Sequence, residues 1–274
     1  MSKKISLVGI QMIPVADKKE NFKKALAMAD EALQSYRHVD MVVLPEYFYD
    51  MDISDKESFG KYPEDVKEAF AMRAKAYETY ILCGTVLHRK EDGKLYNTAI
   101  LFNRQGEIVA DYDKVHLFDV LDGIGDDQES NYCQRGDSLT IYEADFGKIG
   151  ISICYDVRFP ELARTLALQG VEYLFTPAAF YSPRADHWTS LNAATALQNS
   201  MYVMGVNLFG QWDEDNIFCG RSCLVDPWGV TIAQASDKDC ILQAYVDADY
   251  PRQIRERVGS FHNRVPSVYC IPKR

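Results

Sequence analysis

The segment "LTIYEADFGKIGISICYDVRFPEL", residues 139–162, contains the pattern that decides the fold. Its first part predicts two strands joined by a turn at Gly147. Its second part places Cys154 between an apolar run and a cluster of charged residues, and it predicts a helix from about Pro160 to Gln169. Free cysteines are usually buried and inert, so Cys154 is either a structural thiol or a nucleophile held at a strand end.

The rest of the chain shows the same combination of strands and helices. The predicted elements upstream are strands at 5–12, 41–48 and 81–88, helices that begin at Asp17 and Pro63, and a hairpin around Gly106. Those downstream are strands at 172–180 and 201–210, a helix at about 185–200, a hairpin turning at 226–229, and a strand at 240–247 beside that hairpin. Two βαβ-like halves, 5–88 and 149–207, predict a pseudo-repeated α/β architecture with antiparallel pairs added.

Composition limits the class of protein. The 274 residues include 40 acidic and 30 basic side chains, and a net charge of −10 argues against nucleic acid and anionic membranes as partners. No apolar stretch reaches the roughly 18 residues that span a bilayer. Seven cysteines, an odd number, are scattered along the chain, which suits reduced thiols in the cytoplasm. No composition shift divides the sequence, so we expect one domain over residues 1–274.

Two further polar residues follow predicted strand ends. Glu46 in "LPEYF" and Lys114 in "DYDKVHLF" stand in the same relation to a strand as Cys154 does. Functional groups collect outside strand ends in open α/β sheets, so these three side chains could converge. Each also has an ordinary structural explanation: a helix cap or an arginine partner for Glu46, a solvated lysine, and a cysteine that fills the core.

The three segments resemble, in order and spacing, the nitrilase or carbon-nitrogen hydrolase superfamily. The similarity runs over nearly the whole chain and includes "LPE", "YDKVHLF", residues 136–162, "PAAF", "HW", "GVN" and "VDPWG". It implies an α/β fold, a four-layer α-β-β-α sandwich of two mixed sheets. It also implies catalysis without a metal or organic cofactor. It further implies a homodimer or larger assembly, with the C-terminal tail, about 250–274, either across the interface or folded back on its own chain.

The resemblance also implies roles for individual residues. Cys154 is expected to be the nucleophile and Glu46 the general base, since a thiol is mostly protonated at neutral pH and needs a base. Lys114 is expected to lower the pKa of the thiol and, with the backbone N–H of Tyr155, to bind the oxyanion. Glu129 matches a second glutamate that supports the lysine or the substrate in many members. Asp156 and Arg158 are more simply explained as ion pairs that fix the turn.

"YDVRFPEL", "PAAF" and "GVN" look most like the omega-amidase (Nit2) branch, which hydrolyses the terminal amide of small dicarboxylate monoamides such as 2-oxoglutaramate. Such substrates carry a free carboxylate, for which an arginine is the best partner. Arg184 is our candidate, and a surface arginine is the alternative. Phe180, Tyr181 and Tyr47 would line the pocket or merely pack in the core. Gln198 replaces an acidic residue of many relatives, which weakens the subfamily assignment.

Other functions remain open at this point. An N-carbamoyl-amine amidohydrolase would use the same triad and release carbon dioxide as well as ammonia, whereas nitrile hydrolysis fits the motifs less well. A catalytically silent interaction protein is the alternative outside enzymes. His116, two residues from Lys114, suggests a papain-like pair, but no cysteine-protease motif surrounds Cys154. A zinc site is disfavoured because Cys219 and Cys223 lack histidines at finger spacing.

Overall fold

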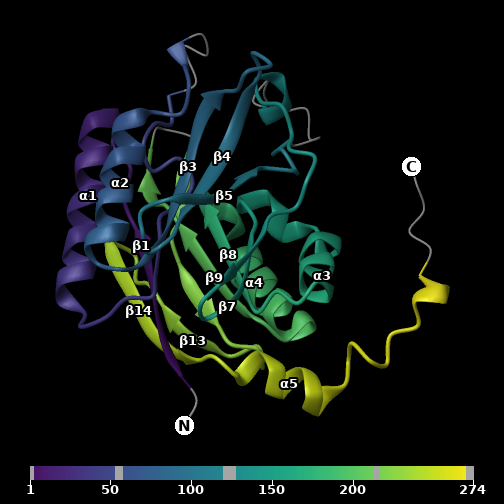
Figure 1. Cartoon of the computed structure of the whole chain (residues 1–274). Coiled ribbons are helices and arrows are strands. Elements are labelled where there is room, and N and C mark those ends of the chain that lie inside the picture. The colour runs from purple at the N-terminus through teal and green to yellow at the C-terminus, as the bar shows by residue number, and fades with distance from the viewer. Residues whose placement is uncertain (1–2, 53–57, 120–127, 213–215, 270–274) are drawn as a thin grey trace.

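The computed structural model describes residues 3–52, 58–119, 128–212 and 216–269. Two six-stranded sheets lie face to face between two pairs of helices (Figure 1). The first sheet contains, in spatial order, β14 (Cys240–Asp247), β1 (Lys4–Gln11), β2 (Met41–Val43), β3 (Tyr80–Arg89), β4 (Leu95–Phe102) and β5 (Ile108–Asp113). The second contains β13 (Thr231–Gln234), β12 (Cys223–Val225), β9 (Tyr202–Asn207), β8 (Tyr173–Ala178), β7 (Gly147–Ile151) and β6 (Ile141–Ala144).

Both sheets have the same pattern of strand directions. From β14 to β5, successive pairs are antiparallel, parallel, parallel, antiparallel and antiparallel. From β6 to β13 the pairs follow the same series. The three parallel strands of each sheet come from one βαβ-like half, which agrees with the repeat predicted from sequence.

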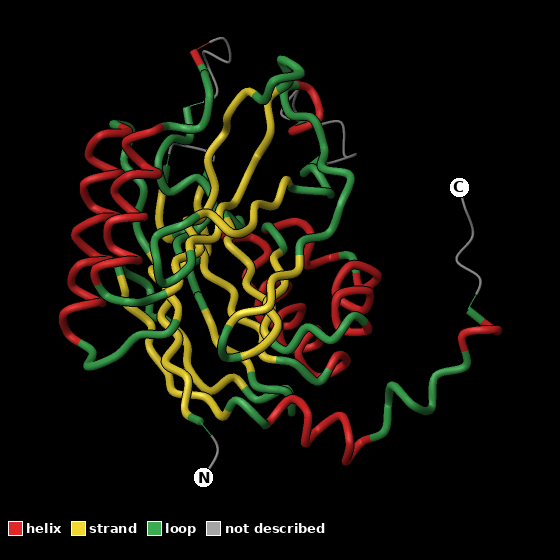
Figure 2. Tube along the Cα trace, viewed as in Figure 1, coloured by secondary structure: helices red, strands yellow, loops and turns green. Residues whose placement is uncertain are grey.

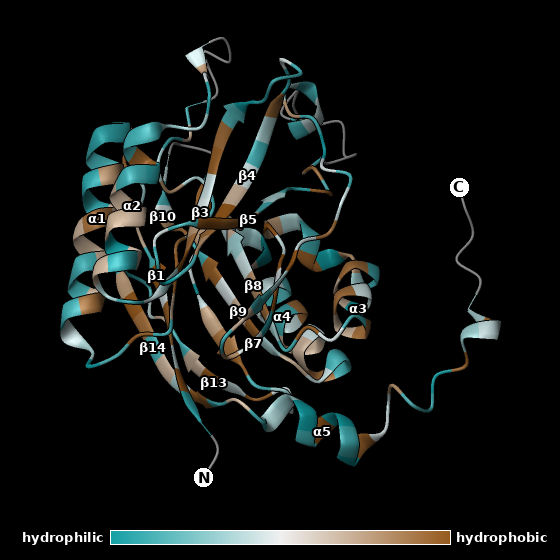
Figure 3. Ribbon diagram, in the orientation of Figure 1, coloured by the Kyte–Doolittle hydropathy of each residue, from teal (hydrophilic) through white to brown (hydrophobic). Residues whose placement is uncertain are grey.

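Helices cover the outer face of each sheet. The helices α1 (Lys18–Ser35) and α2 (Glu64–Ala76) pack on the first sheet, and α3 (Pro160–Leu168) and α4 (Ala185–Asn199) pack on the second. Figure 2 shows the strands between these helices, and Figure 3 shows hydrophobic residues concentrated on the strands. The predicted four-layer α-β-β-α sandwich is therefore confirmed. Within the described ranges, no helix is long and apolar enough to cross a membrane.

The predicted boundaries hold to within a few residues at most elements. Helix α1 begins after Asp17, whose carboxylate accepts the backbone N–H groups of Lys19 and Glu20. The strand expected at 41–48 ends at Val43, and the strand expected at 201–210 divides into β9 and β10 (Phe209–Gln211). Strand β10 pairs with β11 (Ile217–Cys219) as a separate ribbon.

The predicted position of residues 240–247 is wrong. We expected this strand beside the β12–β13 hairpin, but β14 pairs antiparallel with β1 of the other sheet, from Lys4 opposite Asp247 to Gln11 opposite Cys240. Nearness in sequence favoured the hairpin, since consecutive strands usually pair. The long strand β1 would otherwise be an exposed edge, which proteins generally cover.

The chain ends in helix α5 (Tyr250–Val258) and a tail that leads away from the sheets (Figure 1). Ile254 anchors α5 to the body of the protein, because its side chain is buried. Val265, Val268 and Tyr269 of the tail are exposed. Residues 270–274, which belong to the tail considered above, lie outside the described residues.

Candidate active site

The three polar residues predicted at strand ends lie together between the two sheets. Glu46 follows β2, Lys114 directly follows β5, and Cys154 follows β7 as the first residue of a short 3-10 helix, η3 (Cys154–Arg158). Glu129, the first residue of another 3-10 helix, η2 (Glu129–Asn131), joins them. The two glutamates and the lysine are at most 2% exposed and Cys154 is 7% exposed, so the cluster is buried.

A bulge in the neighbouring strand holds Glu46 in place. The pairing of β3 with β4 shifts between Cys83 and Val86, and a Cβ on Gly84 would lie 2.0 Å from the carbonyl oxygen of Pro45. Only glycine allows this close approach of two backbones. The hydroxyl of Thr85 accepts the N–H of Tyr47 at 3.1 Å, and Tyr47 has a positive φ of 55°. Such backbone conformations are costly and persist where the surroundings enforce them.

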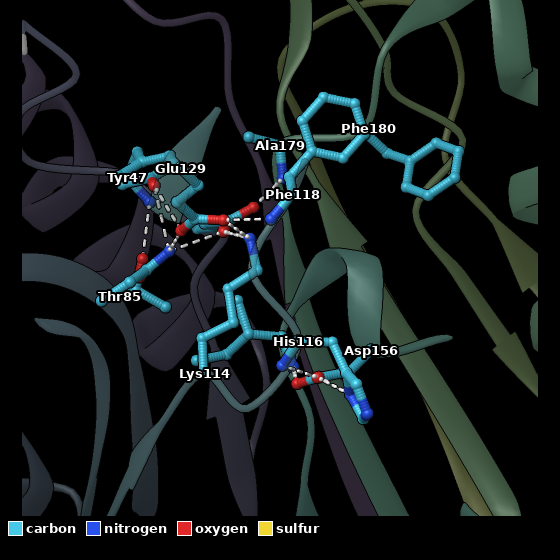
Figure 4. Close-up of polar contacts among 12 residues, drawn as sticks. Tyr47, Thr85, Lys114, His116, Phe118, Glu129, Asp156, Ala179 and Phe180 are labelled. Carbon is cyan, nitrogen blue, oxygen red and sulfur yellow. Dashed lines mark hydrogen bonds and ion pairs between the residues drawn. The ribbon is translucent and has the colours of Figure 1, made fainter. Parts of the chain in front are cut away.

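Lys114 connects the two glutamates. Its Nζ lies 2.9 Å from Oε1 of Glu46 and 2.8 Å from Oε2 of Glu129 (Figure 4). Burial alone would lower the pKa of Lys114, but the two carboxylates outweigh it and hold the pKa well above its usual value. The side chain is therefore an ammonium group, with three N–H donors, of which two contact the glutamates.

Four donors surround the carboxylate of Glu129. Oε1 accepts from Nδ2 of Asn97 at 3.0 Å and from the Tyr47 hydroxyl at 3.1 Å, and Oε2 accepts from Lys114 and from the N–H of Phe118 at 2.8 Å. Burial raises the pKa of Glu129, but Lys114 and the other donors lower it further than burial raises it. A carboxylate has about four acceptor sites, and all four are occupied here. Glu129 is therefore fixed as an anion.

Glu46 differs because it retains capacity on one oxygen. Oε1 accepts from Lys114 and from Nδ2 of Asn97, each at 2.9 Å, whereas Oε2 accepts the N–H of Ala179 at 2.8 Å. The carboxylate of Glu46 is also close enough to Cys154 to raise the pKa of its thiol. Of the two buried glutamates, Glu46 is thus the one that has an acceptor site without a donor among the described residues.

The Cys154 thiol is protonated in this environment. Burial and the Glu46 carboxylate raise its pKa, and together they outweigh Lys114 and the N–H of Ala179, which lower it. The sequence predicted the lowering by Lys114 but not the stronger opposing effects. A thiol with a pKa well above its ordinary value needs an adjacent base before it can act as a nucleophile.

Asp156 holds the turn that carries Cys154, where the backbone is strained at a φ of 44°. Its Oδ2 accepts the N–H of Ile153 at 2.8 Å and the Tyr112 hydroxyl at 2.7 Å. Its Oδ1 accepts the N–H of His116 at 3.0 Å and lies 2.7 Å from Nδ1 of the same ring. His116 therefore connects the loop of Lys114 to the turn that carries Cys154, and its ring stacks on Phe159.

Of the two residues expected to fix the turn through ion pairs, Asp156 contacts His116, whereas Arg158 has no carboxylate partner among the described residues. Arg158 lies over the ring of Phe180, with its Cζ 5.2 Å from the ring centroid, and Arg184 lies over Phe118 at 5.8 Å. Burial lowers the pKa of Arg158, and the positive charge of Arg184 lowers it further. Among the described residues, neither guanidinium is paired with a carboxylate. Two adjacent arginines without an acidic partner are a suitable site for an anion.

The other residues predicted near the pocket have varied surroundings. Tyr155 packs its ring against Phe118 at 5.2 Å, and Tyr181 stacks on Phe218 at 5.3 Å. Tyr47 belongs to the polar network rather than to an apolar wall, since its hydroxyl contacts Glu129. Gln198 is exposed on α4, where its carbonyl oxygen accepts from Arg164 at 2.7 Å.

Cysteines and histidines do not gather elsewhere in the described part of the chain. No three His, Cys, Asp or Glu side chains converge there as a metal ion would require. Cys219, considered above as a zinc ligand, instead has its Sγ 3.1 Å from Nδ2 of Asn207.

Residues 4–256 match the carbon-nitrogen hydrolase family. The chain belongs to this family. The hydrolase is 32% identical to "Omega-amidase NIT2" of Xenopus tropicalis over 276 residues, which cover 99% of this chain and 98% of that protein. It is 35% identical to "Deaminated glutathione amidase" of Synechocystis over 273 residues, which cover 93% and 96%. The crystal structure of Saccharomyces cerevisiae Nit3, from branch 10 of the nitrilase superfamily, superposes with a TM-score of 0.85 at 28% identity over 94% and 95% of the two chains.

Two groups of the hydrolase were not identified from its sequence. Asn97 lies in the apolar segment "LYNTAILF", and a polar residue inside a buried strand is the signal that could have revealed it. The N–H of Ala179 gives no such signal, because any residue at that position supplies a backbone donor.

Proposed function

We propose that the hydrolase cleaves small non-peptide amides to a carboxylic acid and ammonia, with Cys154 as nucleophile, Glu46 as general base and Lys114 as electrostatic partner. One observation carries the proposal: the Glu46 carboxylate raises the pKa of the buried Cys154 thiol beside it, and the same carboxylate contacts the buried ammonium group of Lys114. This is the arrangement that activates a cysteine by a neighbouring base.

The first half of the reaction forms a thioester. The Sγ–H bond of Cys154 breaks as its proton moves to Glu46, and the thiolate attacks the amide carbon. The third N–H of Lys114 and the backbone N–H of Tyr155 then stabilise the oxyanion. The protonated Glu46 gives its proton to the amide nitrogen, the C–N bond breaks, and ammonia leaves.

The second half releases the acid. Glu46, again a carboxylate, removes a proton from water, and the hydroxide attacks the thioester carbon. The C–S bond breaks, the carboxylic acid leaves, and the thiolate regains a proton from Glu46. Glu129, held as an anion by four donors, keeps Lys114 charged and in position throughout the cycle.

We further propose omega-monoamides of small dicarboxylic acids, such as 2-oxoglutaramate, as substrates. The guanidinium groups of Arg158 and Arg184, which have no carboxylate partner among the described residues, support a substrate with a free carboxylate. A relative named omega-amidase supports the same class. Arg184 was predicted from sequence, and Arg158 joins it because the two guanidinium groups are close enough to repel each other.

The test is ammonia release from 2-oxoglutaramate, succinamate, deaminated glutathione, glutamine and an N-carbamoyl amine, with wild type and Cys154→Ala. We expect wild type to act on the omega-monoamides and Cys154→Ala to be inactive. Carbon dioxide release from the N-carbamoyl amine would favour the alternative amidohydrolase. If no compound is cleaved and iodoacetamide does not modify Cys154 above the background of the other thiols, the enzyme assignment is wrong.

The arginines are tested separately. We expect Arg158→Ala and Arg184→Ala each to raise KM for succinamate by at least about tenfold, because each removes a charge-assisted contact. KM for an uncharged amide should stay the same. Arg252→Ala is the matched control, since Arg252 is an exposed arginine that pairs with Asp249 at the start of its own helix. An unchanged KM for succinamate in both site variants would contradict the carboxylate assignment.

We also propose a cytoplasmic homodimer or larger homo-oligomer. The exposed apolar residues of the tail, Val265, Val268 and Tyr269, support an additional contact surface. Six free cysteines in the described ranges suit a reducing compartment. Light scattering of the purified full chain tests the assembly, and a monomer at micromolar concentration would contradict it.

A further inference from the structure

Asn97 contacts more of the active-site cluster than any role in strand packing would require. It lies on β4, and the next residues on the same face, Ala99 and Leu101, belong to the core between the sheets. Its carbonyl oxygen accepts the backbone N–H of Lys114 at 2.9 Å. Its side-chain Nδ2 lies 2.9 Å from Oε1 of Glu46 and 3.0 Å from Oε1 of Glu129.

The side-chain amide of Asn97 is oriented by the acceptors that its N–H groups contact. Two N–H bonds are available on Nδ2, and three acceptors lie within hydrogen-bond distance: one carboxylate oxygen of each glutamate and, at 3.0 Å, the hydroxyl of Tyr47. No described group donates to the buried Oδ1 of Asn97. A buried acceptor without a partner is costly, so the amide is held in this orientation by the two anions.

From this geometry we propose that Asn97 is a positioning residue that gives the two buried glutamates different roles. By donating to Oε1 of both, it occupies the same oxygen on each glutamate and leaves Oε2 of Glu46 as the oxygen that exchanges a proton with Sγ of Cys154. The proposal rests on Glu46 being the base of the proposed function.

The charges around Glu46 explain the choice of oxygen. Lys114 faces it from the loop after β5, Glu129 from η2, and Cys154 from η3. Oε1 lies between the N–H donors of Lys114 and Asn97, so a proton there would point at other hydrogens. Oε2 has the N–H of Ala179 as its donor and one remaining site. The proton that leaves the thiol therefore binds Oε2, from which it can reach the leaving ammonia.

Loss of Asn97 should make the site bind an additional proton more readily. Without the amide, the Glu46 carboxylate loses one donor that favours its ionised form, and Oε1 gains a free acceptor site. A hydrogen bond to a charged group corresponds to about one pH unit or more. The rate at which iodoacetamide modifies Cys154 should fall as the pH is lowered, and we call this fall the acid limb of the profile. We expect its midpoint to move up by about one pH unit in Asn97→Leu.

The experiment measures iodoacetamide modification of the Cys154 peptide against pH by mass spectrometry, and it needs no amide substrate. Wild type should show an acid limb that is lost in Glu46→Gln. If Glu46→Gln leaves the limb unchanged, Glu46 is not the base, and the proposed function fails. If the limb depends on Glu46 but Asn97→Leu does not move it, only the role of Asn97 is overturned.

A matched variant separates positioning from general damage. Thr98→Val removes a buried hydroxyl from the opposite face of β4, where it contacts His88 and Asp113, and should not move the midpoint.

A variant that folds is required for this comparison. If Asn97→Leu does not fold, Asn97→Ser replaces it, because a single short hydroxyl cannot reach both carboxylates, and the same upward shift is expected. A purely structural role would lower the plateau of the profile in either variant and leave its midpoint unchanged. That result would contradict the proposal.

Discussion

Replacing Asp156 by asparagine should uncouple the nucleophile turn from the lysine loop. Each carboxylate oxygen of Asp156 accepts one backbone N–H, from Ile153 on Oδ2 and from His116 on Oδ1. An amide has only one oxygen, so its NH2 group must face one of these backbone donors. The Tyr112 hydroxyl and the His116 ring can reorient to accept, but a backbone N–H cannot.

The magnitude follows from this count. One backbone N–H loses its acceptor in a buried site, which costs about 1–3 kcal/mol. The remaining bonds lose the assistance of the charge, which is worth roughly another 1 kcal/mol. The sum, about 2–4 kcal/mol, corresponds to a fall in Tm of about 4–8 °C for a protein of this size. Because Cys154 lies within the freed turn, between Ile153 and Asp156, the proposed mechanism predicts a fall of about 100-fold in kcat/KM through misplacement of its thiol.

Thermal unfolding and steady-state kinetics on the same preparations provide the assay. Asp145→Asn is the control, since Asp145 is a half-exposed aspartate that pairs with Arg104, and exposed pairs contribute about 0–1 kcal/mol. If the Asp156→Asn protein has the same Tm and the same kcat/KM as wild type, the reasoning is refuted. A loss of Tm without loss of activity would show that Asp156 stabilises the fold but does not position Cys154.

Three other predictions concern the same fold. Gly84→Ala should lower Tm by at least about 4 °C and abolish activity, because its Cβ would lie 2.0 Å from a backbone oxygen, whereas Gly60→Ala, with no atom within 4 Å of the added carbon, should change neither. Lys114→Met should slow iodoacetamide modification of Cys154 at pH 7 by at least about tenfold, because the ammonium lowers the pKa of the thiol; peptide mass spectrometry showing an equal rate would contradict this. Burial, followed by the charge of Lys90, lowers the pKa of His88 in the folded protein from 6.5 to about 4. As the pH falls, His88 therefore gains its proton in the unfolded chain before it does so in the folded protein. Unfolding free energy should therefore fall by about 2 kcal/mol between pH 6.5 and pH 4, and the slope should flatten in His88→Gln.

Much of the fold could be predicted because local signals agree with one another. The turn at Gly147, the Asp17 cap and the apolar strands each specify an element without reference to the rest of the chain. Glu46, Lys114 and Cys154 could be expected together because functional groups collect outside strand ends in α/β folds, although Glu46 and Lys114 follow strands of the first sheet and Cys154 follows a strand of the second. The family motifs then indicated which chemistry these residues support.

What sequence reasoning missed depends on contacts between distant segments. Strand β14 carries no mark that assigns it to β1 rather than to the nearby hairpin, since either partner would satisfy its backbone groups. Asp156 could be recognised as part of the turn, but its partners Tyr112 and His116 lie about 40 residues earlier in the chain. The net rise in the pKa of Cys154 follows from burial, which is a property of the packed structure.

The measurement that tests the central claim most directly is the detection of the acyl-enzyme. Wild-type protein is mixed with succinamate, quenched in acid during turnover, and digested for mass spectrometry. The proposed mechanism predicts a succinyl group on the Cys154 peptide that disappears once substrate is exhausted, and no such group or ammonia release in Cys154→Ala. Ammonia release by Cys154→Ala at the wild-type rate, or an acyl group on a different cysteine, would contradict the account.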